Sequence, residues 1–304
     1  MLDLRRLALL HRFAKLGSIA ATAASFGYSP SAVSQQLAVL EREVGAALLE
    51  RTARSAELTD VGQRLARHAA TILDAVETAE ADLASYRAMP MGRVVVAAAP
   101  TAALALAPAL AALRDRYQQL EVVVRQAAPG AALADLDAHE VDIAVVDDWS
   151  DAAPAERPGC DARRLLRDPV ALALPRSHPA AKAAGPIELS EVSEDAWICA
   201  PPGEPSRDAF DRVMADAGIR PVVGWEFQGL TTIAALIGHG VGIALLPRLA
   251  VTFSSATDDI VLREPSIALA RHFDAVTRTA ARDRPAIQTV VGAIADELAV
   301  HRTA

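Results

Sequence analysis

A group of small hydrogen-bonding side chains between residues 29 and 42 has the composition of a surface that reads DNA bases. A glutamine side chain can pair with the edge of an adenine, a serine hydroxyl can bond to a base or a phosphate, and an alanine leaves room for a thymine methyl group. On a helix these residues share one side, and they are Ser31, Ser34, Gln35, Ala38 and Arg42. The alternative interpretation is the surface helix of an ordinary bundle, with its polar side facing water.

Two short helices joined by a turn would position this polar side. Ser18 is a suitable N-cap for the first helix, and Gly27 suits the left-handed backbone at its end. Ser29 followed by Pro30 predicts the start of the second helix, which Gly45 ends. The other side of the second helix is apolar and faces a core through Val33, Leu37, Leu40 and Val44. The pattern is that of a helix-turn-helix, whose second helix enters the major groove.

The flanking segments complete a compact unit around these two helices. An apolar helical face precedes them, formed by Leu2, Leu4, Leu7, Leu10, Phe13 and Leu16. The stretch 48–59 is too short for another pair of helices and is expected to form a two-stranded wing. Arg51 and Arg54 would lie at the tip of the wing, where guanidinium groups can reach phosphates beside the groove.

An ordered motif runs through this unit and beyond it. It comprises residues 29–36, Leu40-Glu41, Gly45, Leu48-Leu49, Arg51, Arg54, Leu58-Thr59 and Gly62. With this motif, residues 1–60 resemble the winged helix-turn-helix of LysR-type transcriptional regulators, although Leu49 stands where the family often has Phe and Asp60-Val61 where it has Glu-Ala or Pro-Ala. The resemblance implies a DNA-binding set of Ser29, Pro30, Ser31, Ser34, Gln35, Ala38, Arg51 and Arg54.

A long amphipathic helix is expected over residues 60–88. Its apolar residues keep to one side at spacings of three and four, as Val61, Leu65, Ala69, Ile72, Val76, Ala79, Leu83 and Tyr86. The resemblance implies that this seam pairs with the same helix of a second subunit, and the alternative is that it packs against its own chain. The Met-Pro-Met-Gly run at 89–92 ends the helix and marks a domain boundary.

From residue 92 onward apolar strands alternate with helices, a pattern typical of a parallel α/β sheet covered on both faces. Strands are expected at 94–98, 121–125, 141–146, 170–174, 197–199, 222–227, 242–247 and 273–277, and helices at 104–117, 131–139, 207–217, 231–239 and 285–300. This part resembles the effector domain of the same family, two α/β subdomains joined by crossing strands as in type II periplasmic binding proteins. The expected limits are 1–59 for the DNA-binding domain, 60–91 for the linker helix and 92–304 for the effector-binding domain, with subdomain I at 92–167 and 267–304 and subdomain II at 168–266.

Loops at the carboxyl ends of these strands are the expected ligand contacts, because helix N-termini point their amides into the cleft there. The candidates are Pro100, Thr101, Asp147, Asp148, Pro202, Gly203, Ser206, Gly229, Thr231 and Thr232. The alternative for Thr101 is a plain helix N-cap, and for the two aspartates it is solvated surface charge. If the aspartates face the cleft, they favour a cationic or amine-bearing effector.

Composition restricts the remaining classes of function. The net charge is −8, yet residues 1–59 carry seven basic and five acidic side chains, a net charge of +2, which leaves −10 on the remainder and suits a protein that binds DNA through one patch. Cys160 and Cys199 lack the spacing of a metal or redox pair, so inert buried thiols are expected, with a redox-sensor role as the alternative. The scattered histidines predict no metal site, and the sequence contains no nucleophile or cofactor motif, so neither catalysis nor a cofactor is expected.

One uncharged stretch, from Val94 to Leu113, is about long enough to span a bilayer. It is rich in alanine and contains Pro100 and Pro108, so a strand, a turn and a helix are the better interpretation. Basic residues at 5, 6, 12 and 15 interrupt any signal-peptide core. A cytoplasmic protein without a membrane partner is expected.

Taken together, these features predict a DNA-binding transcriptional regulator. The resemblance implies a homodimer within a homotetramer that reads an interrupted inverted repeat at a promoter, a small-molecule effector between the subdomains, and RNA polymerase as a possible further partner. Two other classes stay open. One is a ligand-binding or enzymatic α/β protein whose head makes protein–protein contacts, and the other is an architectural DNA binder whose cleft is vestigial.

Overall fold

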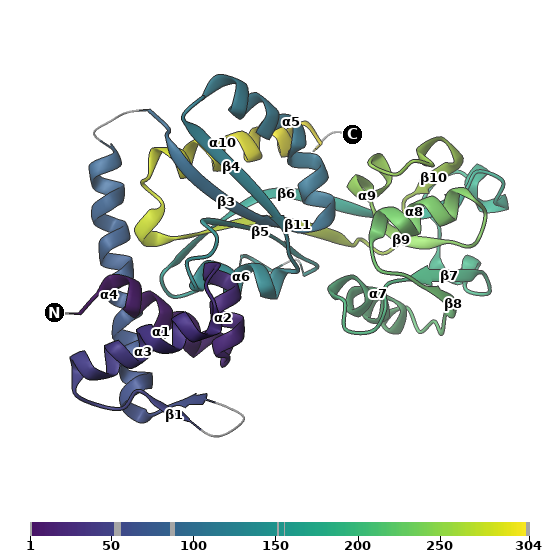
Figure 1. Ribbon diagram of the computed structural model, residues 1–304. Coiled ribbons are helices and arrows are strands. Elements are labelled where there is room, and N and C mark those ends of the chain that lie inside the picture. Colours follow the sequence, from purple (N-terminus) through teal and green to yellow (C-terminus); the bar gives the residue numbers. More distant parts are fainter. Residues whose placement is uncertain (1, 52–55, 86–88, 151, 155, 302–304) are drawn as a thin grey trace.

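The computed structural model describes residues 2–301 apart from 52–55, 86–88, 151 and 155. It has three parts, which are an N-terminal helical head, one long helix, and a body of two α/β lobes (Figure 1). The long helix runs beside the first lobe, and the second lobe lies on the far side of the first lobe from this helix (Figure 1).

The head consists of three helices and a β-hairpin, and its helices begin and end where local signals predict. The Oγ atoms of Ser18 and Ser29 cap the second and third helices, accepting hydrogen bonds from the backbone N–H groups of Ala21 (3.3 Å) and Ala32 (3.2 Å). Gly27 ends the second helix in the left-handed conformation, with φ at 66°. The elements are α1 Leu4–Leu16, α2 Ile19–Phe26, α3 Pro30–Val44, β1 Leu49–Arg51 and β2 Ala56–Leu58.

One apolar core joins the head to the start of the long helix, α4 (Asp60–Ser85). Ala66 and Ala69 of α4 are buried in it together with residues of α1 and α3, among them Leu7, Leu10, Phe13, Val33, Leu37 and Leu40. Gly62 permits the close approach of α4 to the head, because a Cβ atom at this position would lie 2.2 Å from the carbonyl oxygen of Leu48. The first turns of α4 therefore belong to the head.

The apolar seam of α4 packs against the head over part of its length and is exposed elsewhere. Ala69 is fully buried and Leu65 and Ile72 pack against the head core, so the prediction that the whole seam faces a second subunit is wrong for this part. Val61 and Leu83 remain exposed, at 47% and 67%. Tyr86, the last residue of the predicted seam, lies outside the described residues.

The first lobe is built on a sheet whose strands β3 (Gly92–Ala98), β4 (Leu120–Gln126) and β5 (Ile143–Asp148) are parallel. The prediction of a wholly parallel sheet is wrong, because β11 (Ala270–Arg278) pairs antiparallel with both β5 and β6 (Cys160–Pro175). Helices α5 (Pro100–Arg116) and α10 (Pro285–Val300) cover one face of this sheet. The short helix α6 (Pro129–Asp137) covers the other face (Figure 1).

The second lobe shares strand β6 with the first, since β6 pairs with β11 up to Pro169 and with β9 (Ala244–Pro247) from Val170 onward. The predicted strand 170–174 is thus only part of a 16-residue crossing strand, and β10 (Ile260–Arg263), antiparallel to β6, was not expected. A separate parallel pair is formed by β7 and β8. The remaining elements are β7 Ala196–Cys199, β8 Val222–Glu226, α7 Pro205–Asp216, α8 Leu230–Gly238 and α9 Arg248–Thr252. In the described part of the chain, no helix is both long and apolar enough to cross a membrane.

Candidate DNA interface and ligand cleft

The polar side of α3 lies on the surface of the head. Ser31 and Gln35 are exposed, and Ser34 and Ala38 are half-buried. On the opposite side Val33, Leu37 and Leu40 have no exposed surface. The helix is therefore held rigidly by its apolar side while its small polar side chains face outward, an arrangement suited to insertion into a major groove.

Short-range hydrogen bonds hold the start of α3 and connect its later turns to the wing. The hydroxyl oxygens of Ser29 and Ser31 lie 2.9 Å apart, next to Pro30 at the first helical position. Glu41 Oε1 accepts hydrogen bonds from the backbone N–H groups of Leu48 (2.9 Å) and Leu49 (3.0 Å), which connects α3 to the wing. The predicted wing is present, since β1 and β2 pair antiparallel.

The two arginines predicted for the wing tip are only partly located. Arg51 ends β1 and pairs with Ala56 of β2 in the hairpin register. The side chain of Arg51 and the whole of Arg54 lie outside the described residues.

Several basic side chains that gave the head its net positive charge face carboxylates of the same chain. Arg6 Nη2 lies 2.7 Å from Glu43 Oε1 within the head. Arg12 and Lys15, on α1, instead face the acidic α6 region of the body through Asp135 (3.5 Å), Glu140 (3.7 Å) and Asp137 (3.9 Å). Arg12 is buried by this contact. The positive charge that the head presents to solvent is therefore smaller than the residue count indicates, although Arg5 and Arg42 are exposed.

A cavity of about 370 Å³ lies between the two lobes, at the carboxyl ends of β3, β4 and β5. Six of the predicted ligand contacts line it, namely Pro100, Thr101, Asp147, Ser206, Gly229 and Thr231. Residues at the N-terminal ends of α5, α6, α7 and α8 all contribute to its wall. The volume falls within the range of about 300–1,000 Å³ found for small-molecule sites.

Four predicted contacts do not line this cavity. Asp148 is engaged locally, because its carboxylate accepts hydrogen bonds from the backbone N–H (3.1 Å) and hydroxyl (2.6 Å) of Ser150. Pro202 and Gly203 form the turn before α7, and the N–H of Thr232 donates to the carbonyl of Gly229 (3.0 Å). These four positions, Asp148, Pro202, Gly203 and Thr232, are absent from the cavity wall.

Thr101 is not a helix N-cap. The cap of α5 is Ala99, which makes Thr101 the second helical residue, 4% exposed and on the cavity wall. The alternative interpretation of this threonine is therefore wrong.

A buried charged group at the base of the cleft escaped the sequence analysis. Arg271 lines the cavity with 1% exposure, and its Nη2 donates to Asp168 Oδ2 (2.7 Å), while Nη1 lies 3.9 Å from Asp147 Oδ2. The indole Nε1–H of Trp149 donates to the same Asp147 oxygen (3.0 Å). Asp168 also accepts a hydrogen bond from the N–H of Leu249 (3.1 Å). Arg271 lies just before the strand expected at 273–277, and its partner Asp168 is 103 residues away in sequence, so no local pattern indicated the pair.

Two sequence profiles cover most of the chain. The profile described as "Bacterial regulatory helix-turn-helix protein, lysR family" matches residues 4–63, and that described as "LysR substrate binding domain" matches residues 87–299. The chain belongs to the LysR family of transcriptional regulators. As in that family, a DNA-binding head is combined with an effector-binding domain of two α/β subdomains.

Individual relatives of this LysR-type regulator are distant but extend over nearly its whole length. The HTH-type transcriptional regulator CbbR of Xanthobacter flavus is 28% identical over 291 residues, which covers 95% of this chain and 86% of the relative. Full-length OxyR from Pseudomonas aeruginosa has the same fold with a TM-score of 0.70 at 20% identity, with 98% of both chains covered. The fold of full-length CbnR, in its complex with target DNA, is similar with a TM-score of 0.53 at 20% identity, covering 98% of this chain and all of CbnR.

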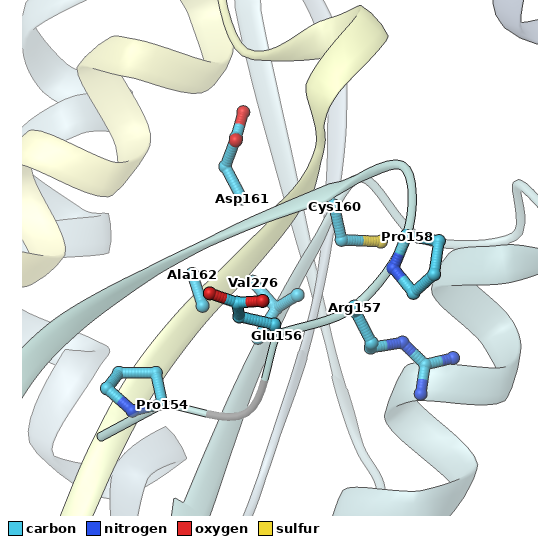
Figure 2. Close-up of a pocket in the computed structure, with 8 residues that line it drawn as sticks. All are labelled: Pro154, Glu156, Arg157, Pro158, Cys160, Asp161, Ala162 and Val276. Atoms are coloured by element: carbon cyan, nitrogen blue, oxygen red, sulfur yellow. The ribbon is translucent and has the colours of Figure 1, made fainter.

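The two cysteines of the regulator lie in different lobes. Cys160 starts β6 beside Arg157 and Pro158, on the wall of an open hollow of about 570 Å³ (Figure 2), and Cys199 ends β7. Burial raises the pKa of both thiols above the ordinary value, to which the charge of Asp137 adds at Cys160. Raised pKa values keep both sulfurs protonated near neutral pH, which makes them poor nucleophiles and poor metal ligands.

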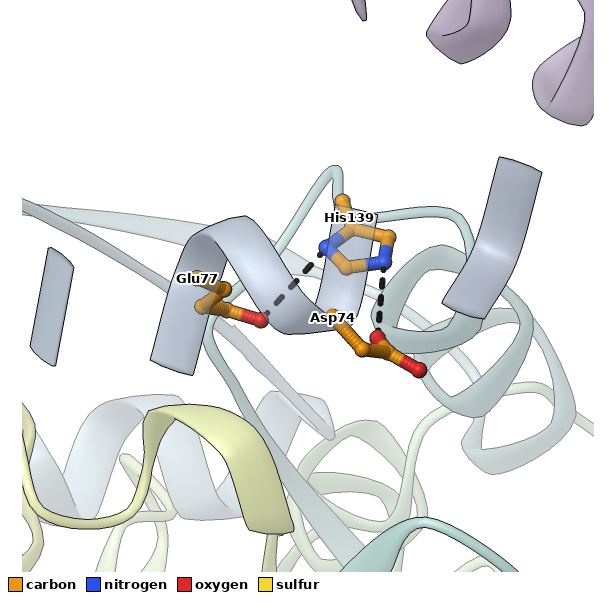
Figure 3. Close-up of side chains that lie close together, drawn as sticks. All are labelled: Asp74, Glu77 and His139. Carbon is orange, nitrogen blue, oxygen red and sulfur yellow. Dashed lines mark ion pairs between the residues drawn. The ribbon is translucent and has the colours of Figure 1, made fainter. Parts of the chain in front are cut away.

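The linker helix is attached to the body by a buried ionic cluster, which no motif in the sequence indicated. His139 lies between Asp74 and Glu77 of α4, at 3.4 Å and 3.5 Å (Figure 3). Both oxygens of Glu77 accept hydrogen bonds from Arg278 of β11, at 2.6 Å and 2.7 Å. The potential ligand atoms of Asp74, Glu77 and His139 lie close enough together for a metal ion. Because Arg278 already binds both carboxylate oxygens of Glu77, the geometry is that of an ion-pair junction.

Proposed function

We propose that this LysR-type regulator binds a promoter as a homodimer within a homotetramer and reads an interrupted inverted repeat. In each bound head α3 enters the major groove, where Ser31, Ser34, Gln35 and Ala38 contact base edges. The start of α3, at Ser29 and Pro30, and the wing residues Arg51 and Arg54 contact the phosphate backbone. The observation that carries this proposal is the exposed polar side of α3 on a helix whose other side is fully buried.

The cavity between the lobes is proposed as the effector site. Its contacts would be Pro100, Thr101, Asp147, Ser206, Gly229 and Thr231, together with Arg271 at its base. Because Arg271 on β11 pairs with Asp168 on β6, a ligand that contacts Arg271 would bind at a residue that joins the two strands connecting the lobes. A ligand that binds one arrangement of the lobes more tightly than another shifts the protein toward that arrangement.

Strand β11 offers a direct route from this cleft to the head. Arg271, near one end of the strand, lines the cleft, and Arg278, at the other end, binds Glu77 of the linker helix. Seven residues of strand span roughly 23 Å. A change in the lobes would therefore reach α4 through one rigid element and alter the spacing of two heads or the bend of the DNA between them.

The remaining parts of the proposal follow from the family. We propose that the protein acts in the cytoplasm and carries no catalytic activity, with RNA polymerase as a candidate further partner. The exposed ends of the α4 seam, at Val61 and Leu83, support self-association through this helix.

Footprinting with the full-length protein and the DNA upstream of its own gene tests the proposal. Two protected half-sites one or more helical turns apart are expected, with base-specific protection in the major groove of each. Binding with no sequence preference in the presence of competitor DNA, or no binding at all, would overturn it.

A further inference from the structure

The proposed effector cleft carries an excess of negative charge on one side and of unused hydrogen-bond donors on the other. From this polarity we propose that its ligand is a zwitterion of the α-amino-acid type, with an ammonium group against Asp147 and a carboxylate at the N-termini of α5, α6 and α8. The inference rests on the proposed role of the cleft and adds the chemical class of its ligand.

The acidic side is formed by two carboxylates that share one arginine. Asp147 and Asp168 have side chains that are 12% and 3% exposed, and both face Arg271, which is 1% exposed. Each carboxylate also accepts a further hydrogen bond, Asp147 from the indole N–H of Trp149 and Asp168 from the backbone N–H of Leu249.

One guanidinium group neutralises only one of these two carboxylates, so a buried negative charge is left over. Among the described residues of the cavity wall, Arg271 is the one basic side chain, and Glu204 adds a further carboxylate. A buried uncompensated charge is costly, and a ligand cation beside Asp147 would remove that cost.

The donor side consists of three helix N-termini that have no side-chain caps. Ala99, Ala128 and Gly229 are the N-cap residues of α5, α6 and α8, make no side-chain capping bond, and line the cavity. None of these helices has an acidic residue in its first turn. By contrast, the helices of the head are all capped by an oxygen of Asp3, Ser18 or Ser29.

A second group on the cavity wall also lacks an acceptor. The Nε atom of Arg271 is buried and has no hydrogen-bond partner among the described residues. Together with the helix N-termini, whose first N–H groups have no intrahelical acceptor, it gives the cleft donors from which a ligand carboxylate can accept in place of water. A carboxylate supplies two acceptor oxygens and the negative charge that helix N-termini favour.

The two sides are close enough for one small molecule. Strands β4, β3 and β5 are adjacent and parallel, with Ala98 of β3 paired to both Gln126 of β4 and Val145 of β5. Asp147 follows Val145 by two residues, so it lies one strand away from the start of α5, a separation of roughly 5 Å. Such a spacing suits an amine and a carboxylate borne by one short molecule in a cavity of about 370 Å³.

Calorimetry on the full-length protein with each of the twenty common amino acids tests the inference. At least one is expected to bind, while its N-acetyl derivative, which lacks the cation, and its amide, which lacks the carboxylate, each bind about tenfold more weakly or worse. If no amino acid binds, or if either derivative binds as well as the parent, the inference is wrong.

Variants separate the two ends of the ligand. Asp147→Asn should lower the affinity for the amino acid by about tenfold or more and leave the affinity for the N-acetyl derivative unchanged. Asp148→Asn should change neither affinity, because the Asp148 carboxylate is engaged with Ser150. Ala128→Asp places an acid at the exposed N-cap of α6 and should lower the affinity for the ligand by repelling its carboxylate. Ala128→Asn, which places an uncharged side chain at the same position, is the control. Equal affinities across these pairs would overturn the inference.

Footprinting of the same proteins on DNA distinguishes a failure of the zwitterion proposal from a failure of the proposed regulatory function. Wild-type protein and Asp148→Asn, whose carboxylate does not line the cavity, are expected to give the same footprint in the absence of amino acid. A normal footprint with no amino acid binding would reject the zwitterion alone, and a missing footprint would reject the regulator.

Discussion

Replacing Glu77 by glutamine should break the attachment of the linker helix to the body. The carboxylate of Glu77 accepts two hydrogen bonds from Arg278, whose side chain is 6% exposed and which also donates to the carbonyl oxygens of Leu136 and Val141 (both 2.7 Å). The variant removes the carboxylate that binds this buried guanidinium most closely and leaves it Asp142, whose Oδ1 lies 3.6 Å from Nη2. Removing one partner of a buried pair costs about 3–5 kcal/mol, and the amide oxygen still accepts one hydrogen bond, so a loss of about 3 kcal/mol is expected.

Urea unfolding followed by tryptophan fluorescence measures this loss, because Trp149, Trp197 and Trp225 all lie in the body. Glu80→Gln, a matched change at an exposed position of the same helix, should stay within about 0.5 kcal/mol of the wild type. If Glu77→Gln is no less stable than Glu80→Gln, the junction does not hold the helix. If the footprint of Glu77→Gln still responds to ligand as the wild-type footprint does, the proposed coupling of the cleft to α4 through β11 is wrong.

The same junction makes a prediction about pH. Burial by itself would raise the pKa of Glu77, but the hydrogen bonds and charge of Arg278, with smaller contributions from His139 and Arg284, outweigh it and hold the pKa below its ordinary value of 4.5. A carboxyl whose pKa is lower in the folded state contributes stability that is complete above the unfolded value and is lost as the pH falls through the folded value. The stability difference between wild type and Glu77→Gln should therefore shrink as the pH falls below about 4.5. A difference that grows on acidification would contradict this assignment.

Three further perturbations follow from the head and the thiols. Arg51→Ala should weaken binding to all DNA sequences and lower the salt slope of log K by about one, and an effect confined to one operator base would contradict the phosphate contact. Gly62→Ala should destabilise the head and abolish the footprint, because its Cβ would meet the Leu48 carbonyl at 2.2 Å, and an unchanged melting curve would show that α4 is not held there. Peroxide, at concentrations that leave methionines intact, should not change the footprint of the wild type, Cys160→Ser or Cys199→Ser, because both thiols are held protonated. If peroxide shifts the wild-type footprint and one of the two variants lacks this shift, the cysteine replaced in that variant has a redox role.

The helices of the head could be predicted because their signals are local. Ser18, Gly27, Ser29 and Pro30 fix the ends of α2 and α3 through contacts within four residues. The apolar spacing of Val33, Leu37 and Leu40 then determines which side of α3 faces outward.

The ligand cleft could be predicted only in part, because local sequence patterns indicate its strands, whereas its charged pairs join residues far apart in the sequence. Strand ends indicated Thr101 and Asp147 correctly as parts of the cavity wall. The pair of Arg271 and Asp168 joins residues 103 apart in sequence, and neither residue forms a recognisable motif. No periodicity distinguishes the part of the α4 seam that packs on the head from the part that stays exposed.

Selection of binding sites from randomised DNA, with wild type, Gln35→Ala and Gln288→Ala, tests whether α3 reads the bases of the operator. Gln288 is exposed on α10, remote from the head, and serves as the control. Gln35→Ala is expected to lose preference at one position in each half-site and about 1–3 kcal/mol of affinity, while Gln288→Ala is expected to select the wild-type sequence. An unchanged sequence preference in Gln35→Ala would contradict the reading role of α3.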